Sequence, residues 1–320
     1  MRVRTLHWLA RDVVGMVLES IDETALPIAA PGSHVSLFLR PGLQRAYSVV
    51  GNGGLSTCYE IAVAKSPNST GGSRYVHEKV RVGDLIEVSS PRNLFALDET
   101  ASASVLVAGG IGITPIYSMV QRLEALEKPW HLLYATRSRD AAAYLTELET
   151  LAARTRVGML RLHFDDQAGG YAPDLDALIA NAPAGTHVYC CGPSPMLAAF
   201  QAASMRLPPT HVHLERFTAG AAVSAPGEAA RNGFQVVLAR SNRRFDVPPD
   251  KSILDVLLDH GIDAQYGCMQ GVCGACATSV LDGRVEPVAG DVIQPEGVDG
   301  HTRILLCQRH SATPVLTLDL

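Results

Sequence analysis

Four cysteines close to the C-terminus have the spacing of a metal-cluster motif. Cys268, Cys273 and Cys276 follow the pattern C-x4-C-x2-C, and Cys307 lies 31 positions after Cys276. Four thiolates with this spacing are the ligand set of a 2Fe-2S cluster. Glycines in the same loop allow it to wrap closely around an inorganic core and to point N–H groups at sulfur. The sequence therefore predicts a 2Fe-2S cluster on these four cysteines.

Two alternatives remain for the same cysteines. A zinc site with four cysteine ligands usually pairs them in two C-x2-4-C knuckles, whereas here the fourth cysteine stands alone. Buried thiols without a metal are the second alternative. The chain has seven cysteines and no signal peptide, so a disulfide framework is a poor interpretation.

A glycine-rich turn and a shorter motif indicate a second site, for a phosphate-bearing cofactor. The turn GGIGITP, residues 109–115, follows a strand-like run and begins a helix, which brings backbone N–H groups to a helix N-terminus. It lacks the spacing of G-x-G-x-x-G, so a tight strand-to-helix connection is the alternative. The motif CGP, residues 191–193, ends a later strand, and its cysteine by itself is often only a small buried residue.

The elements that must position these motifs change in character along the chain. Up to about residue 98, short apolar runs broken by Gly, Pro and Asn predict an antiparallel barrel. Strands then alternate with helices, which predicts a doubly wound parallel sheet whose strand ends carry both nucleotide motifs. Strands are expected at 104–110, 131–137 and 186–193, and helices at 115–127, 140–153 and 195–205. Residues 218–233 are rich in Ala, Gly and Ser, which is typical of a linker.

A third unit follows the linker. It begins with the strands FQVVLAR and RRFDVP and continues with a helix that starts near Pro249 or Asp250 and ends at Gly261. The expected domains are a barrel at 1–100, an α/β domain at 101–217, the linker at 218–233 and the cluster domain at 234–320.

Composition excludes several classes of protein. With 47% hydrophobic and 18% charged residues the chain is expected to be globular. Its net charge of −5, without any block of like charges, argues against nucleic acid or an anionic membrane as a partner. No stretch approaches the ~20 apolar residues of a membrane span. A soluble, cytoplasmic protein is expected.

In their order, the motifs resemble those of the ferredoxin-NADP reductase superfamily, in which a flavin barrel precedes the nucleotide domain. Its flavin signature R-x-Y-S is matched by Arg45, Ala46, Tyr47 and Ser48. A C-terminal domain similar to a plant-type ferredoxin then extends the resemblance to the phthalate dioxygenase reductase family, whose members carry FMN. The resemblance covers essentially all 320 residues and implies an α+β, β-grasp fold for the cluster domain.

The resemblance also implies the roles of individual residues. Arg45 would meet the flavin phosphate, Tyr47 the isoalloxazine face and Ser48 the reactive ring nitrogen. Ser48, Cys191 and Glu215 would surround the contact between flavin and nicotinamide. Further flavin contacts are expected from Ala62, Val63, Lys65, Gly71, Gly72, Ser73 and Phe217. The nucleotide contacts are expected from Gly110, Gly112, Thr114, Pro115, Cys191, Gly192, Pro193 and Met196.

The function implied is electron transfer. NAD(P)H would reduce FMN, and the 2Fe-2S cluster would pass single electrons to the Rieske centre of a terminal oxygenase or O-demethylase. The protein is expected to be a monomer. A self-contained reductase of a small electron acceptor would have the same motifs and is the alternative. A non-enzymatic redox sensor would need the cluster but not both the flavin and the nucleotide motifs.

The choice of nicotinamide nucleotide depends on residues 137–139. NADH-using relatives commonly carry an Asp where this chain has Ser138, beside Arg137 and Arg139. A hydroxyl between two guanidinium groups can bind a 2′-phosphate, which predicts that NADPH is accepted at least as well as NADH. The alternative is that both arginines point to solvent. Asp140 is expected to be the N-cap of the next helix.

Overall fold

The computed structural model describes residues 1–40, 43–51, 55–66, 71–217, 233–249, 251–262, 264–266, 274–286, 302–308 and 311–320. These belong to two compact units, one of residues 1–39 and 46–217 and the other of residues 40–45 and 218–320. Apart from Gly233, the expected linker lies outside the described residues. No helix among the described residues is long and apolar enough to cross a bilayer.

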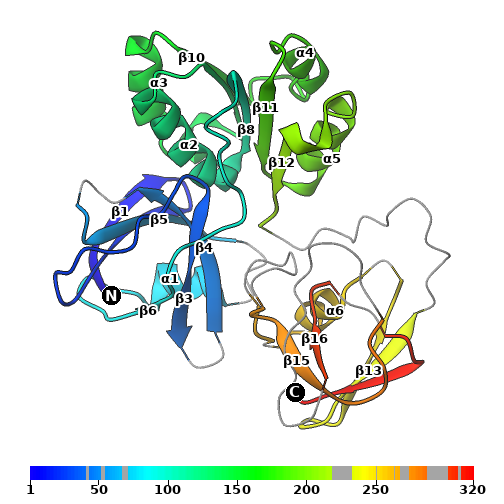
Figure 1. Cartoon of the computed structure of the whole chain (residues 1–320). Helices are drawn as coiled ribbons and strands as arrows, with labels where there is room; N and C mark the ends of the chain where they lie inside the picture. The colour runs from blue at the N-terminus through cyan, green and yellow to red at the C-terminus, as the bar shows by residue number, and fades with distance from the viewer. Residues whose placement is uncertain are drawn as a thin grey trace. The chain divides into compact units, whose positions relative to one another are not determined.

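The first sheet is antiparallel and curled, as the sequence predicts. Its order is β1-β2-β5-β4-β3-β6, and β7 pairs with β3. A bridge between Arg2 and Leu85 joins β1 to the residues just before β6, so that the two edges of the sheet meet (Figure 1). The elements are β1 (Arg2–Ala10), β2 (Val13–Glu19), β3 (Ser33–Arg40), β4 (Leu43–Gly51), β5 (Cys58–Ala64), α1 (Gly72–Glu78), β6 (Glu87–Val88) and β7 (Arg92–Asn93).

The second sheet is parallel, which confirms the doubly wound prediction. Its order is β10-β9-β8-β11-β12, so the chain runs outward from β8 in one direction and then restarts beside β8 with β11. The carboxyl ends of β8 and β11 therefore form a topological switch point. The strands are β8 (Ala103–Gly109), β9 (Trp130–Thr136), β10 (Gly158–Phe164), β11 (Thr186–Cys191) and β12 (Val212–Glu215).

Helices cover both faces of this sheet (Figure 1). Residues of α2 and α3 pack on one face and residues of α4 and α5 on the other, and β10 is left at the edge. The helices are α2 (Ile113–Ala125), α3 (Leu145–Arg154), α4 (Leu175–Ala180) and α5 (Ser194–Ala203), with short 3-10 turns η1 (Gly110–Gly112), η2 (Arg139–Ala141) and η3 (Pro209–His211).

One hydrophobic cluster joins the curled sheet to the parallel sheet. Val50 and Ala62 of the curled sheet pack in the same core as Ile113 and Ile116 of α2. Polar contacts add to this core, since the Tyr144 hydroxyl donates to Glu60 over 3.2 Å. Burial of shared apolar surface fixes the curled sheet against the sheet that carries the nucleotide motifs.

Two predicted helix boundaries are wrong. The helix expected at 140–153 is replaced by η2 and then α3, which begins only at Leu145 because Tyr144 adopts a left-handed conformation, with φ 58°. Asp140 is not its N-cap, because Tyr144 holds that position, and the Asp140 carboxylate instead accepts a hydrogen bond from Ser138 Oγ. The helix expected from Pro249 or Asp250 begins at Ile253, because Ser252 and Asp255 form a capping box.

The C-terminal sheet has five strands in the order β14-β13-β17-β15-β16. Its neighbours are antiparallel except for β13 and β17, and the apolar face of α6 joins its core, giving the expected α+β arrangement. The elements are β13 (Phe234–Leu238), β14 (Arg243–Val247), α6 (Ile253–Asp259), β15 (Ala277–Asp282), β16 (Arg303–Leu305) and β17 (Val315–Leu318).

Candidate functional site

Two of the four predicted cluster ligands lie side by side in the C-terminal unit. Cys276 immediately precedes β15 and Cys307 follows β16, and these strands pair with Ala277 opposite Leu305. The two sulfur atoms are 3.2 Å apart, beyond the ~2.05 Å of a disulfide bond. Both residues are buried. Cys268 and Cys273 lie outside the described residues.

This thiol pair fits one end of an iron–sulfur cluster. Thiolates that share a tetrahedral metal at ~2.3 Å lie a little under 4 Å apart, so small shifts would let both reach one ion. The apolar residues of the same core shield the pair from water, and Gly274, at φ 74°, turns the chain just before Cys276. The donor set is therefore appropriate to the predicted cluster.

The two nucleotide motifs meet at the switch point of the parallel sheet. A Cβ atom added to Gly112 would lie 2.2 Å from the carbonyl oxygen of Cys191. A Cβ added to Gly109 would lie 2.6 Å from Pro193, and one added to Gly192 would lie 2.7 Å from the sulfur of Met196. The glycines are needed because the two turns are in direct backbone contact. The position of both turns at this edge confirms the sequence prediction.

Not every residue of the turn faces the same way. Gly110 has φ 55°, and a Cβ added there would meet no atom within 4 Å, so this residue faces open space. Thr114 is buried, and its hydroxyl donates to the carbonyl of Ile111 over 3.0 Å, which stiffens the turn. Pro115 lies in the first turn of α2, as expected. A ligand would therefore approach the turn at Gly110.

A row of three residues crosses the sheet at its carboxyl end. Cys191 on β11 lies opposite Ala108 on β8 and Glu215 on β12. Cys191 is fully buried, and its burial, together with the Glu215 carboxylate, raises the pKa of the thiol well above its ordinary value. The thiol is therefore neutral at physiological pH. Phe217, two residues after Glu215, is 40% exposed.

The R-x-Y-S residues lie along β4. Arg45 is buried, and its Nη1 donates to the carbonyl of Gln44 over 2.7 Å. Ala46 and Tyr47 are partly buried. Ser48 is buried, and its hydroxyl has no hydrogen-bond partner among the described residues. A buried hydroxyl is seldom left unpaired, so Ser48 fits a cofactor atom as its partner.

The second predicted phosphate loop is tied to β5, which carries Ala62 and Val63. His77 on α1 hydrogen-bonds the carbonyl of Val63 over 2.9 Å. Gly71, with φ 106°, precedes α1, and the hydroxyl of Ser73 accepts from the N–H of Ser66 over 3.1 Å. Lys65 pairs with Glu78 at 3.1 Å. Gly72 is buried in the first turn of α1, and residues 67–70 lie outside the described part of the chain.

The loop predicted to read the nucleotide 2′ position is held by contacts that the sequence did not indicate. Both carboxylate oxygens of Glu149 accept from Arg139 Nη2, at 2.7 and 2.6 Å. Ser138 Oγ accepts from Arg11 over 2.9 Å and donates to Asp140 over 2.5 Å. Arg137 is exposed. A single sequence shows only which residues are neighbours along the chain. Arg11 and Ser138 are 127 positions apart, so the sequence did not indicate their contact.

Comparison with known proteins shows which families and which proteins this chain resembles. Residues 106–202 match an oxidoreductase NAD-binding domain, and residues 236–310 match a 2Fe-2S iron-sulfur cluster binding domain. Tetrachlorobenzoquinone reductase of Sphingobium chlorophenolicum is 44% identical over 100% of this chain and 97% of its own length. Phenoxybenzoate dioxygenase subunit beta of Ectopseudomonas oleovorans has the same identity and coverage. A solved phthalate dioxygenase reductase is 31% identical, with TM-score 0.70, over 100% of this chain and 97% of that one.

Proposed function

The chain belongs to the phthalate dioxygenase reductase family, and from this membership we propose that it supplies electrons to a terminal oxygenase with a Rieske centre. It is an NAD(P)H-dependent oxidoreductase with FMN and a 2Fe-2S cluster. The observation that carries the proposal is the buried Cys276–Cys307 pair, 3.2 Å apart, because a one-electron carrier is needed for delivery to a protein acceptor. When bound, FMN accepts two electrons with a hydride and the cluster carries them singly.

The residues of the switch point bind and orient the nicotinamide nucleotide in this proposal. The open side of Gly110 admits the pyrophosphate to the N-terminal end of α2, next to Gly112, Thr114 and Pro115. Gly192, Pro193 and Met196 close the opposite wall through the contacts with Gly109 described above. Because the two turns touch, the position of one sets the position of the other.

Two neutral groups, Ser48 and Cys191, are assigned to the reacting rings in the proposed mechanism. The Ser48 hydroxyl would donate to the flavin ring when FMN is bound, which would satisfy a group that is otherwise buried without a partner among the described residues. Cys191, held as a thiol by its raised pKa, would add no negative charge of its own next to the nicotinamide ring. We assign Glu215 to hold a proton or to bind a polar group of the nicotinamide. We assign Phe217 to cover the face of the flavin.

The remaining flavin contacts are assigned to two segments. Arg45, Ala46 and Tyr47 hold the flavin from β4. On the other segment, Ala62 and Val63 meet it from β5, Lys65 meets it just after that strand, and Gly71, Gly72 and Ser73 meet its phosphate. The four ligands Cys268, Cys273, Cys276 and Cys307 hold the cluster. Arg137, Ser138 and Arg139 are assigned to the 2′ position of the nucleotide.

The domain organisation belongs to the same proposal. Its parts are a flavin domain at 1–100, a nucleotide domain at 101–217, a linker at 218–233 and a cluster domain at 234–320. We assign the protein to the cytoplasm, as a monomer that forms transient contacts with its oxygenase. Small, polar interfaces suit such contacts.

Anaerobic stopped-flow reduction of the whole protein tests the proposal. Mixing with NADH or NADPH is expected to bleach the flavin absorbance first and the cluster absorbance second, and an added Rieske oxygenase is expected to become reduced. Flavin released by mild acid is expected to have the mass of FMN, and stoichiometric FAD would contradict that assignment. A protein that bleaches in the expected order but reduces no Rieske protein would contradict the oxygenase role.

A second candidate function is a self-contained reductase of a small quinone. It is favoured by the 44% identical relative named tetrachlorobenzoquinone reductase. Steady-state turnover separates the two candidates. Rapid reduction of a chlorinated benzoquinone, together with failure to reduce Rieske oxygenases, would support the quinone reductase.

A further inference from the structure

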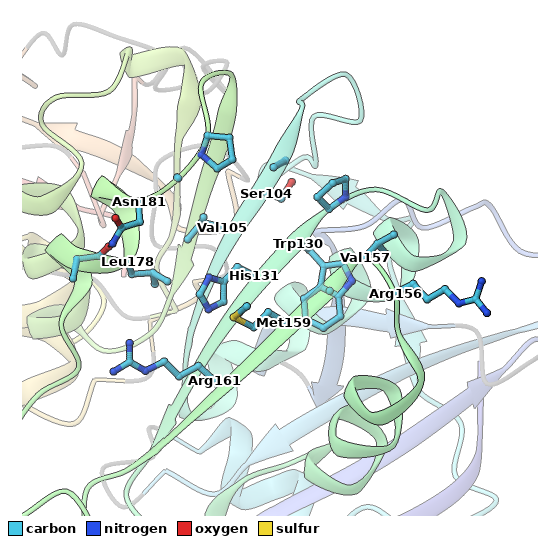
Figure 2. A pocket seen from close by; sticks show the side chains of 16 residues that line it. Ser104, Val105, Trp130, His131, Arg156, Val157, Met159, Arg161, Leu178 and Asn181 are labelled. Carbon is cyan, nitrogen blue, oxygen red and sulfur yellow. The ribbon is translucent and has the colours of Figure 1, made fainter.

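A groove lies at the edge of the parallel sheet opposite the nucleotide motifs. It has a volume of about 460 Å³ and is lined at the amino ends of β8, β9 and β10 and along α4 (Figure 2). The glycine turn and Cys191 lie at the carboxyl ends of β8 and β11. The length of the strands thus separates the groove from the proposed nucleotide site. A volume of this size suits a small molecule.

The floor of the groove is a row of three residues across neighbouring strands. Val105 on β8 lies opposite His131 on β9, and His131 lies opposite Met159 on β10, so the three side chains share one face of the sheet. Leu178 of α4 forms a wall. Met159 is 59% exposed, which shows that helices on this face do not cover β10. The groove therefore offers an apolar surface for a flat ring.

The polar groups of the groove are cationic or neutral. Arg161 follows Met159 by two positions and shares its face, and Arg156 stands at another side of the groove (Figure 2). Neither arginine forms an ion pair with a described residue, and no carboxylate is among the lining residues. His131 Nε2 is buried and has no hydrogen-bond partner among the described residues.

The protonation state of His131 is consistent with a groove that holds no negative charge. Burial, and then the charge of Arg161, lowers the pKa of His131, so the ring is neutral at physiological pH and can donate one hydrogen bond. Arg161 is exposed and forms no ion pair with a described residue, so its guanidinium is suited to an oxygen atom that carries negative charge.

We propose that this groove binds a small aromatic carboxylate, with its ring on Val105, Met159 and Leu178 and its carboxylate toward Arg161. An apolar floor of this size favours one ring over a polyphosphate, and the absence of lining acids favours an anion over a neutral molecule. The site is independent of the proposed oxygenase role, because occupancy needs neither flavin reduction nor a partner.

Titration calorimetry of the flavin- and cluster-loaded protein with benzoate tests the site, with benzamide as a neutral molecule of the same shape. Saturable benzoate binding with a Kd of about 1 mM or tighter is expected, and benzamide is expected to bind at least tenfold more weakly. Saturating NADP⁺ is expected to leave benzoate binding unchanged. Absence of saturable binding, or equal binding of benzamide, would overturn the proposal.

Matched variants locate the binding. Arg161→Gln and Met159→Glu are expected to weaken benzoate binding about tenfold, the first by removing the cation and the second by adding a carboxylate to the floor. Arg206→Gln and Met205→Glu make the same changes at exposed residues outside the groove and are expected to have no effect. Equal effects of the two pairs would place benzoate elsewhere. A groove that binds an acidic peptide such as hexaglutamate but not benzoate would be a protein-docking surface, which also contradicts the proposal.

Discussion

Replacing Gly112 with Ala tests whether contact between the two nucleotide turns controls turnover. The φ of Gly112 is −59°, so alanine brings no backbone strain and the effect comes from the added methyl group. That carbon would lie 2.2 Å from the Cys191 carbonyl oxygen, and even a separation of 3.0 Å requires a shift of 0.8 Å (3.0 − 2.2). A misplacement of about 1 Å can cost ~100-fold in rate, and overpacking costs ~1–3 kcal/mol of stability.

Steady-state NAD(P)H oxidation with ferricyanide measures the effect, because ferricyanide can take electrons from the flavin directly. For Gly112→Ala we expect kcat/KM for the nicotinamide nucleotide to fall by about 10- to 100-fold, with flavin content unchanged. Gly83→Ala is the control, since Gly83 has φ 97° and open space around it, so only strain is added, away from the site. A Gly112→Ala protein within twofold of wild-type kcat/KM would refute the reasoning.

Three further predictions concern the cluster, the 2′ position and acid stability. Cys307→Ser is expected to abolish the cluster absorbance but keep the flavin, so that ferricyanide reduction survives and cytochrome c reduction is lost; wild-type cytochrome c reduction would contradict the relay through the cluster. Arg139→Ala is expected to lower kcat/KM for NADPH more than for NADH. Glu149→Gln, which releases Arg139, is expected to raise the ratio of kcat/KM for NADPH to kcat/KM for NADH. Equal effects on both nucleotides would show that the loop does not read the 2′ position. Burial lowers the pKa of His187 and of His213, whose stacked rings have their centres 5.2 Å apart. Below pH 6.5 the unfolded chain therefore binds protons more readily than the folded chain, and the folded state loses stability as pH falls. Urea unfolding at pH 7.0 and 5.5 is expected to show a loss of at most about 1.4 kcal/mol per histidine, and His213→Gln is expected to reduce that loss; an unchanged pH dependence would contradict it.

The sequence was most informative where chemistry requires a fixed spacing. The turn at 109–115 and the motif at 191–193 each end a buried strand, and parallel strands must bring their carboxyl ends to one edge. The sequence alone therefore predicts that the two turns meet. The cluster cysteines were recognisable for a similar reason, because four thiolates must reach one inorganic core.

Contacts between distant segments could not be predicted in this way. The start of α3 at Leu145 depends on Tyr144, whose left-handed conformation accompanies a hydrogen bond to Glu60 and stacking on Tyr117 at 5.0 Å. Local propensity over 140–153 favours helix throughout, and tertiary contacts override it at the beginning. Arg11 is similar, since its contacts with Ser138 and Asp140 arise only when the curled sheet packs on the parallel sheet.

These contacts also limit how strongly the chain can distinguish NADPH from NADH. The Arg139–Glu149 pair is exposed, with 53% and 39% of the two side chains accessible, and such pairs contribute only ~0–1 kcal/mol. A 2′-phosphate carries more charge than a carboxylate and would compete with Glu149 for Arg139, but its gain is limited by the same exposure of Arg139 to solvent. Ser138 is less available, because its hydroxyl already bridges Arg11 and Asp140. We therefore expect any discrimination to depend on Arg139 more than on Ser138 and to amount to no more than roughly tenfold, or about 1.4 kcal/mol.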